Sequence, residues 1–400
     1  MNKAVQGRVH SAFYNGYTLS QARAQAPARR PDWTGLTAHA PSSLQIPGGW
    51  AASKYGGHRV LSLSFLLWCT ASLFTPSDGA RTHALVAVRV LVGAAMGVVF
   101  PSIHSILVHW IPVHERSRAV SLFTSGMYFG SAWGMAVLPQ LIARWGPGCV
   151  PRAVGLFGLA WLALWSRFAN RPARGNHADG SLLPAGGSAK RRGEVPWSQL
   201  LRCVPIWALI INNFTFHYAF FILMAWLPTL YDSLGADSSR QGSLKMMPYL
   251  VMGVCSNVGG WAADALITRK FGVTKTRKLL NSAGFALASI ALLMLPGAST
   301  LGNAVGLACW AMGALALARG GYSVNHMDIA PTHAGVLMGL SNGAGSAAGM
   351  VGPWVTGRIL EGAGGGGVAA WHAACALPAG LCTAGAVVYA LLGTGERLFD

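Results

Sequence analysis

The sequence predicts an all-α protein that crosses a membrane many times. Of its 400 residues, 52% are hydrophobic and only 10% are charged, and the mean hydropathy is +0.42. A soluble protein of this size carries about 25% charged residues, so most of this surface must face lipid. Apolar runs near the ~20 residues that cross a bilayer as a helix recur along the chain.

The hydrophobic runs predict ten membrane helices. They lie at about residues 58–76, 84–110, 118–142, 150–170, 204–231, 241–266, 278–297, 301–324, 332–360 and 369–393. Residues 171–203 are rich in Gly, Pro and basic residues, which indicates a flexible linker between a bundle at 46–170 and another at 204–393. Residues 394–400 form a tail.

The charge pattern supports a lipid environment and argues against a nucleic-acid partner. The chain has 30 Lys+Arg against 12 Asp+Glu, a net charge of +18. Many of the basic residues gather in every second loop, as the positive-inside rule requires. They include Lys54, Arg59, Arg116, Arg118, Arg167, Lys190, Arg202, Arg269, Lys275, Arg277 and Lys278.

A compact polar motif lies between two apolar stretches near the C-terminal end. It reads Gly321-Tyr322-Ser323-Val324-Asn325-His326-Met327-Asp328-Ile329-Ala330-Pro331, with Gly339-Leu340-Ser341-Asn342 close behind. This string resembles the loop between the tenth and eleventh helices in the anion:cation symporter branch of the major facilitator superfamily. That branch includes vesicular glutamate transporters, sialin and plastid phosphate transporters.

Two further strings are similar to the plant and algal plastid phosphate transporters of that branch. They are Asn257-Val258-Gly259-Gly260-Trp261-Ala262-Ala263-Asp264 and Thr394-Gly395-Glu396-Arg397. The resemblance covers about residues 46–400 and a short piece at 9–21. It implies two six-helix bundles that move a small anion by alternating access.

An internal repeat agrees with that architecture. Gly48-Gly49-Trp50-Ala51-Ala52-Ser53 recurs as Gly259-Gly260-Trp261-Ala262-Ala263-Asp264, and both copies run into a basic turn, at Arg59 and at Arg277. The repeat resembles the superfamily's loop signature, in which glycines allow close packing and an acid pairs with arginine to gate the inner face. The second copy keeps the acid, whereas Ser53 replaces it in the first. Simple helix-end packing is the alternative interpretation.

The first residues do not fit the family pattern. Residues 1–21 resemble the start of the second helix, and residues 22–45 are rich in Ala, Arg and Pro, which are costly at bilayer depth. We interpret 22–45 as a non-native insertion in a chain whose first helix is missing. A genuine lumenal loop is the rival interpretation.

Arg89 is the first candidate for binding the substrate. It lies inside an apolar helix, where a guanidinium is expensive unless it faces a cavity or a partner, and its planar fork suits carboxylate or phosphate. The resemblance implies an anion-binding arginine here. Snorkelling of the side chain to the near interface is the alternative. Met96 stands where relatives commonly hold a glutamate linked to ion coupling.

Four more residues are candidates for the substrate site. Tyr128 and Asn342 are polar residues flanked by small ones within predicted helices, and a mid-membrane asparagine needs a partner. His217 offers a group that titrates near neutral pH, although relatives place their basic residue one position earlier, at Phe216. Arg319 is either a substrate contact peculiar to this chain or a snorkelling side chain.

Gating or structural roles are predicted for a second set of polar residues. Glu115, Arg116 and Arg118 match the family's inner loop between the fourth and fifth helices, where salt bridges close a gate. Asn325, His326 and Asp328 end a helix on the basic side, and capping of helix ends is their simpler interpretation. With these go Gly48, Gly49, Arg59, Gly259, Gly260 and Asp264.

The sequence therefore predicts a secondary transporter of phosphate or a small organic anion, coupled to Na⁺ or H⁺. No nucleophile elbow, metal box or phosphate-binding loop indicates an enzyme or a cofactor. The resemblance implies a monomer in a plastid envelope or thylakoid membrane. A truncated, non-transporting relative is the alternative, because the first helix and the acids expected at Ser53 and Met96 are missing.

Overall fold

The computed structural model describes residues 44–76, 82–146, 148–169, 195–235, 241–362 and 367–399, and in these ranges it contains helices and no strand. The predicted all-α class is confirmed. Each of the predicted membrane segments is helical, with ends shifted by a few residues, and all but 84–110 fall on a single α-helix. Seven helical segments of the described part are long and apolar enough to cross a membrane. Residues 1–43, which hold most of the predicted insertion, lie outside the described residues.

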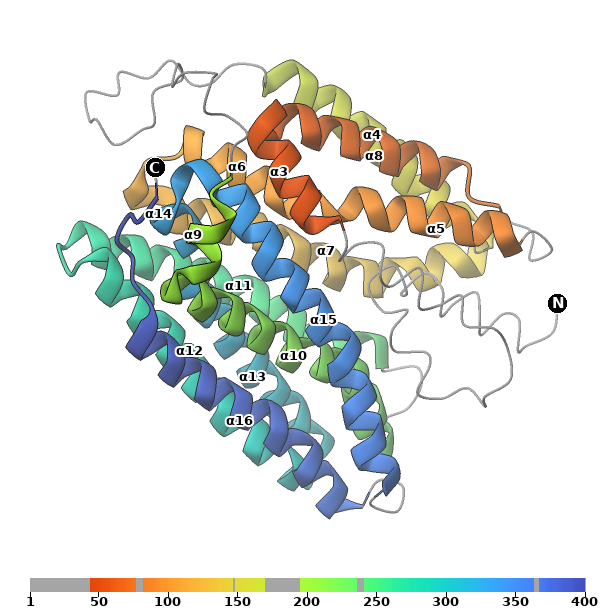
Figure 1. Ribbon diagram of the computed structural model, residues 1–400. Helices are drawn as coiled ribbons and strands as arrows, with labels where there is room; N and C mark the ends of the chain where they lie inside the picture. Colours follow the sequence, from red (N-terminus) through yellow and green to blue (C-terminus); the bar gives the residue numbers. More distant parts are fainter. Residues whose placement is uncertain are drawn as a thin grey trace. The chain divides into compact units, whose positions relative to one another are not determined.

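The described chain divides into two compact units, and the first of them contains five whole helices. These are α3 (Gln45–Tyr55), α4 (Gly57–Leu73), α5 (Thr82–Gly97), α6 (Val99–Trp110) and α8 (Cys149–Phe168). Within this unit α4 packs against α5, α6 and α8, and α3 packs against α4 and α6. The pairing of α4 with α8 is visible in Figure 1. The end of α7 and the start of α15 complete the unit.

The predicted segment 84–110 is two helices rather than one. The chain turns at Val98, between α5 and α6, and Pro101 lies in the first turn of α6. Proline lacks an N–H and its ring displaces the carbonyl of the residue four positions earlier, here Gly97. Hydropathy does not detect this break, because both helices are equally apolar.

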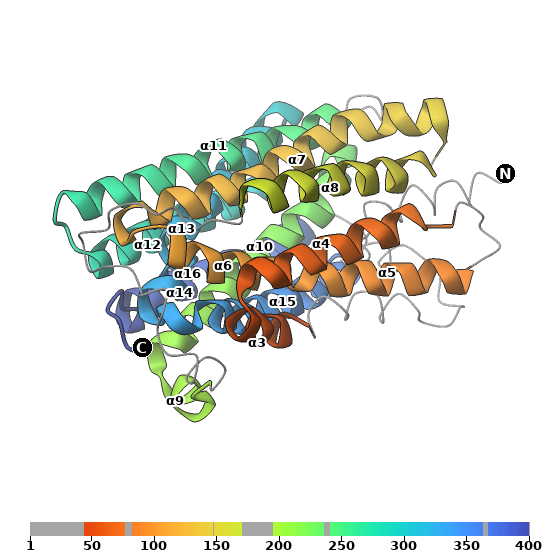
Figure 2. The same cartoon turned by 90° about the horizontal axis from the view of Figure 1, so that it is seen from above.

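The second unit holds the remaining helices and most of the buried polar groups. Its helices are the first part of α7 (Arg116–Trp145), then α9 (Trp197–Arg202), α10 (Val204–Ser233), α11 (Gln241–Thr268), α12 (Val273–Met294), α13 (Leu301–Tyr322), α14 (Asn325–Ile329), most of α15 (Ala334–Gly362) and α16 (Val368–Leu392). Helix α12 packs against α13 and α16, α11 packs against α13, and α10 packs against α16 and α13. Figure 2 shows the same helices from above.

The reversal between α11 and α12 takes only four residues. Lys270 and Gly272 have positive φ values of 62° and 92°, which let the chain turn back at once. Glycine adopts this conformation without steric cost, whereas lysine does so at some expense. The tight turn fixes Arg277, one turn into α12, at the same end of the unit as Asp264 near the end of α11.

The end of the predicted linker is ordered in the structure. Residues 171–194 lie outside the described residues, but 197–202 form α9 in place of the flexible segment expected there. Leu200 is fully buried, and the indole of Trp207 donates a hydrogen bond of 2.8 Å to the Leu201 carbonyl oxygen. Burial of an apolar side chain thus holds a helix too short to persist alone.

Close helix packing in the second unit depends on glycine at specific positions. A Cβ on Gly284 of α12 would lie 2.5 Å from the Ala318 backbone nitrogen and 2.7 Å from the Ala314 carbonyl oxygen of α13. These are backbone atoms and cannot rotate away. A Cβ on Gly306, in the same α13, would meet nothing within 4 Å.

We therefore expect Gly284→Ala to destabilise the protein by about 1–3 kcal/mol through overpacking. Gly306→Ala should be neutral or stabilising by up to about 1 kcal/mol, because alanine restricts the unfolded chain. Thermal unfolding of both purified variants in detergent measures the difference. Equal melting temperatures would show that α12 and α13 are not packed as closely as the structure places them.

Candidate functional site

The second glycine of each repeat copy lies where its helix crosses the first turn of another helix. In the second unit, a Cβ on Gly260 would lie 2.7 Å from the Ser117 carbonyl oxygen of α7. In the first unit, a Cβ on Gly49 would lie 2.8 Å from the carbonyl carbon of Gly335, in the first turn of α15. The first glycine of each copy is also close to a neighbouring residue: Gly48 approaches Val98 in the first unit, and Gly259 approaches Leu317 in the second. The packing role proposed for these glycines agrees with this geometry.

Asp264, four residues after Gly260, binds the N-terminus of α7. Its carboxylate accepts hydrogen bonds from the backbone N–H groups of Ser117 (3.2 Å) and Arg118 (2.9 Å), and from Nε of Arg118 (3.2 Å). The first N–H groups of a helix have no partner within it, and the helix dipole makes that end positive. A buried carboxylate placed there is stabilised by both effects.

Among the described residues, the first repeat copy has no equivalent of this contact. Ser53 donates its hydroxyl proton to the Gly49 carbonyl oxygen of its own helix at 3.0 Å. Arg59, predicted to belong to a gate, is exposed on α4. The local geometry at this copy therefore shows no charge pair of Ser53 or Arg59 among the described residues, as the replacement of the acid by Ser53 led us to expect.

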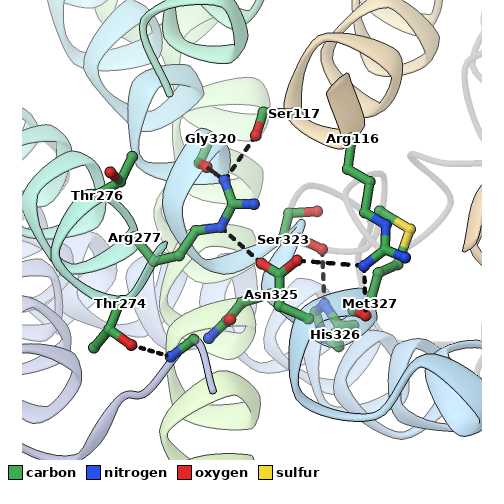
Figure 3. Close-up of polar contacts among 12 residues, drawn as sticks. Arg116, Ser117, Thr274, Thr276, Arg277, Gly320, Ser323, Asn325, His326 and Met327 are labelled. Carbon is green, nitrogen blue, oxygen red and sulfur yellow. Dashed lines mark hydrogen bonds and ion pairs between the residues drawn. The ribbon is translucent and has the colours of Figure 1, made fainter. Parts of the chain in front are cut away.

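Asp328, on the short helix α14, lies between two buried arginines, Arg116 and Arg277, which are labelled in Figure 3. Nε of Arg277 donates a hydrogen bond of 2.9 Å to Oδ2 of Asp328, and Nη1 of Arg116 lies 3.6 Å from Oδ1. All three side chains are at most 4% exposed. Breaking a buried ion pair by removing one partner is strongly destabilising, because the remaining charge is left without water.

Further hydrogen bonds fix both arginines. Nη1 of Arg277 donates to Ser117 Oγ (2.7 Å) and to the Gly320 carbonyl oxygen (3.3 Å), and Nη1 of Arg116 donates to the Met327 carbonyl oxygen (3.0 Å). Burial lowers the pKa of Arg116, which lies just before the predicted span 118–142, and the neighbouring Asp328 opposes this shift. We call Arg116, Ser117, Arg118, Asp264, Arg277 and Asp328 the ion-pair cluster.

Glu115 lies at the edge of this cluster. It accepts a hydrogen bond of 3.2 Å from Nη2 of Arg118, and the two side chains are 47% and 46% exposed. Exposed pairs of this kind contribute about 0–1 kcal/mol. Glu115 is therefore a minor partner compared with Asp264 and Asp328.

Asn325 and His326 hold α14 in place. Asn325 donates Nδ2 hydrogen bonds to the Tyr389 hydroxyl and to the Thr394 carbonyl oxygen, both at 2.7 Å. Nδ1 of His326 lies 2.8 Å from the Ser323 carbonyl oxygen. The capping interpretation fits these two residues in part, whereas Asp328 is the centre of an ion-pair cluster.

Arg319 and Tyr128, two of the predicted substrate residues, contact each other in the second unit. Nη1 of Arg319 donates a 2.9 Å hydrogen bond to the Tyr128 hydroxyl, and the guanidinium carbon lies 4.9 Å from the ring centroid of Phe216. Tyr128 is 1% exposed and Arg319 is 5% exposed. This burial contradicts a snorkelling Arg319 and favours its alternative, a polar group inside the bundle.

His217 follows Phe216 on α10 and is also buried. Its Nδ1 lies 2.8 Å from the Asn213 carbonyl oxygen, and its ring meets Phe216 edge-on with centroids 5.2 Å apart. A Cβ on Gly345 would lie 2.5 Å from Nδ1 of His217, so the glycine leaves room for the ring. Phe216 and His217 together place one aromatic and one polar face beside Arg319.

The remaining two substrate candidates belong to the first unit. Asn342 donates a hydrogen bond of 2.8 Å from Nδ2 to Oε1 of Gln45, which supplies the partner that a mid-membrane asparagine needs. Arg89 is half-buried on α5 and has no hydrogen bond or ion pair to another described residue. Its guanidinium is thus not committed to a structural partner within that part of the chain.

Several members of the site were not singled out from the sequence. Arg277 was noted only as part of a basic turn, and neither Ser117 nor Phe216 was assigned a role. Arg277 is one of several cations in its loop, and the acid that it binds lies 51 residues away. A useful signal was the scarcity of acids. The chain has only 12 Asp+Glu against 30 Lys+Arg, so few acids lie anywhere but in the loops and at the helix ends.

Comparison with known proteins agrees with this geometry. The sequence model of the Major Facilitator Superfamily matches residues 33–353. The chain is 45% identical to "Probable anion transporter 6" of Oryza sativa subsp. japonica, with 100% of this chain and 91% of the relative covered. It is 35% identical to "Ascorbate transporter, chloroplastic" of Arabidopsis thaliana, with 100% and 70% covered. It is 34% identical to "Sodium-dependent phosphate transport protein 1, chloroplastic" of the same plant, with 100% and 73% covered.

A solved structure shares the fold. The structure of a proton:xylose symporter of the superfamily matches with a TM-score of 0.70 and 14% identity, covering 98% of this chain and 94% of that one. The helices and the buried charges define a multi-helix membrane protein of the transporter type. The chain belongs to the major facilitator superfamily.

The ion-pair cluster predicts a large effect of Asp328. We expect Asp328→Asn to destabilise the protein by about 3–5 kcal/mol, because Arg116 and Arg277 lose their shared buried counter-charge. Glu115→Gln, which breaks an exposed pair in the same region, should cost less than about 1 kcal/mol.

Thermal unfolding of the two purified variants in the same detergent measures both changes. Similar losses from the two variants would mean that the Asp328 pairs are as weak as a surface contact.

Proposed function

We propose that this chain is a secondary active transporter that moves a small anion, inorganic phosphate or an organic anion, by alternating access. The observation that carries the proposal is the ion-pair cluster. It ties Arg116 and Arg118, which precede the predicted linker, to Asp264, Arg277 and Asp328, which follow it. Alternating access requires contacts of this kind that close one side of a transporter and break when it opens.

The cluster is suited to a gate because its contacts are few and specific, and its side chains are buried apart from the half-exposed Arg118. Each acid contacts the segment that precedes the predicted linker. Asp264 binds the Arg118 side chain and the N-terminus of α7, and Asp328 pairs with Arg116. Separation would expose all of these charges to water at once, and water would then replace the lost partners. Two discrete states follow from such an arrangement, rather than a continuous range.

The substrate is proposed to be an anion because each candidate site contains an arginine, which carries a permanent positive charge. Arg319 lies among Tyr128, Phe216 and His217 in the second unit, and Arg89 lies on α5 of the first. A guanidinium binds carboxylate or phosphate through two parallel hydrogen bonds. The names of the relatives support the same class, since one is called an ascorbate transporter and another a phosphate transport protein.

Coupling to Na⁺ or H⁺ is part of the proposal, and the sodium-dependent relative favours Na⁺. Met96 cannot titrate, so a proton-coupled mechanism would have to use another group. A plastid membrane is proposed because relatives carry chloroplastic names, and the transporter is proposed to act as a monomer without a cofactor. A non-transporting relative is the alternative, which Met96 and Ser53 favour.

Uptake into proteoliposomes tests the proposal. The purified chain should take up labelled phosphate or ascorbate faster than protein-free vesicles, and an inward Na⁺ gradient should accelerate uptake more than a proton gradient does. Equal uptake with and without protein for both anions, in either gradient, would favour the non-transporting alternative.

Arg89 provides the first site-specific prediction. Arg89→Lys keeps the charge but loses the fork, so the apparent affinity for the anion should fall about tenfold to a hundredfold, corresponding to roughly 1.5–3 kcal/mol. Arg89→Ala should abolish uptake and leave the melting temperature nearly unchanged.

Arg144→Lys is the matched control, because Arg144 is exposed in the last turn of α7. Unaltered uptake by Arg89→Ala would show that Arg89 snorkels to the interface and does not bind the anion.

Tyr128 provides the second site-specific prediction. Tyr128→Phe removes only the hydroxyl that accepts from Arg319 and that is free to donate its own proton to an anion. We expect the KM for uptake to rise about fivefold, the effect of one ordinary hydrogen bond.

Tyr55→Phe, at a tyrosine that is 55% exposed, is the control. If Tyr128→Phe and Arg319→Lys both left KM unchanged, Arg319 would be a structural residue of the bundle.

A further inference from the structure

The residues after α16 lie against the element that carries Asp328. Thr394–Phe399, which we call the strap, leave α16 at Gly393 and pass over α14. Half of the strap residues are exposed and the others are partly buried, whereas all five residues of α14 are buried. A short buried helix therefore has an accessible segment attached to it.

The strap holds α14 at both of its ends. At the start, Nδ2 of Asn325 donates to the Thr394 carbonyl oxygen at 2.7 Å. At the end, the Ile329 carbonyl oxygen accepts hydrogen bonds from the backbone N–H groups of Leu398 (2.8 Å) and Phe399 (3.2 Å). A helix of five residues cannot persist alone, so these contacts, together with the Asn325–Tyr389 hydrogen bond and the ion pairs of Asp328, fix where α14 lies.

The strap also binds the start of α12. The backbone N–H of Gly395 donates a 2.9 Å hydrogen bond to Oγ1 of Thr274, the threonine labelled in Figure 3. Thr274 lies three residues before Arg277 on the same helix. A Cβ on Gly395 would lie 2.9 Å from the Thr274 backbone nitrogen, so this close approach needs glycine.

The strap thus connects the two elements whose side chains form the shortest ion pair of the cluster. Arg277 is fixed on α12 beside Thr274, and Asp328 is fixed on α14 between Asn325 and Ile329. Nε of Arg277 and Oδ2 of Asp328 are 2.9 Å apart, a distance that a shift of α14 by even one ångström would alter.

We propose that Thr274 and Asn325 are positioning residues of the gate, which act by anchoring the strap so that Asp328 stays between Arg116 and Arg277. The proposal rests on the transport function proposed above. Release of the strap frees α14, loosens the ion-pair cluster and opens the gate more often. The exposed strap is then the part of the gate that a change at the membrane surface reaches first.

The test compares two threonines of one helix. Thr274→Val removes the hydroxyl that binds the strap, and Thr274→Ser keeps it. Thr276→Val is the matched control, because Thr276 donates only to the Gly272 carbonyl oxygen at the start of its own helix, at 2.8 Å.

Hydrogen–deuterium exchange of the purified full chain in lipid nanodiscs, without substrate, is the first measurement. The amides of Leu398 and Phe399 report on the strap, those of residues 325–329 on α14, and those of Ser117 and Arg118, which bind Asp264, on the gate.

We expect Thr274→Val to accelerate exchange about fivefold at all three places, the factor for one hydrogen bond, and Thr274→Ser and Thr276→Val to leave it near the native rate. Faster exchange in the strap alone, with α14 and Ser117–Arg118 unaffected, would overturn the proposal. Equal acceleration by Thr276→Val would also overturn it, because the effect would then come from α12 itself.

Transport is measured separately on the same variants. If none of the proteins transports an anion, the proposed function fails, while the exchange result still decides whether the strap controls the cluster.

Discussion

The second unit depends on one constraint, the burial of two guanidinium groups around a single carboxylate. Arg116 and Arg277 both lie out of water, and Asp328 is the acid that both contact. A buried charge is tolerated only where geometry and hydrogen bonds compensate for lost hydration. The surrounding polar groups serve that purpose in part, since Ser117 and Gly320 accept from Nη1 of Arg277 and Met327 accepts from Nη1 of Arg116. The position of α14 therefore has to be fixed within a narrow range.

A helix terminus and a glycine help to fix these positions. Gly260 lets α11 approach the first turn of α7, so that Asp264 reaches the N–H groups of Ser117 and Arg118. From the same first turn of α7, Arg116 pairs with Asp328, and Ser117 accepts a hydrogen bond from Arg277. One close crossing thus aligns a helix dipole, an ion pair and a hydroxyl. In the first unit the equivalent crossing exists at Gly49, but without an acid it provides packing alone.

Sequence patterns predicted the helices well because a bilayer requires long apolar runs, and these leave a clear signal. The exceptions are local: Pro101 divides one predicted span, and burial of Leu200 orders residues expected to be flexible. Candidate residues were found where a polar group lies in an apolar run, as for Arg319 and Tyr128, and their mutual contact was not foreseeable. Such contacts join residues far apart in sequence, and no local periodicity records them.

The sequence by itself determined that the chain is helical, lies in a membrane and contains a repeated glycine motif. These properties follow from composition and from short motifs, which depend on neighbouring residues only. Tertiary structure decided which acid meets which arginine: Asp264 binds Arg118, and Asp328 binds Arg277 and Arg116. It also decided that Thr274 and Asn325 hold the strap. Pairing is a matter of distance between helices, because several cations carry the same charge and packing decides which of them lie close enough to each acid.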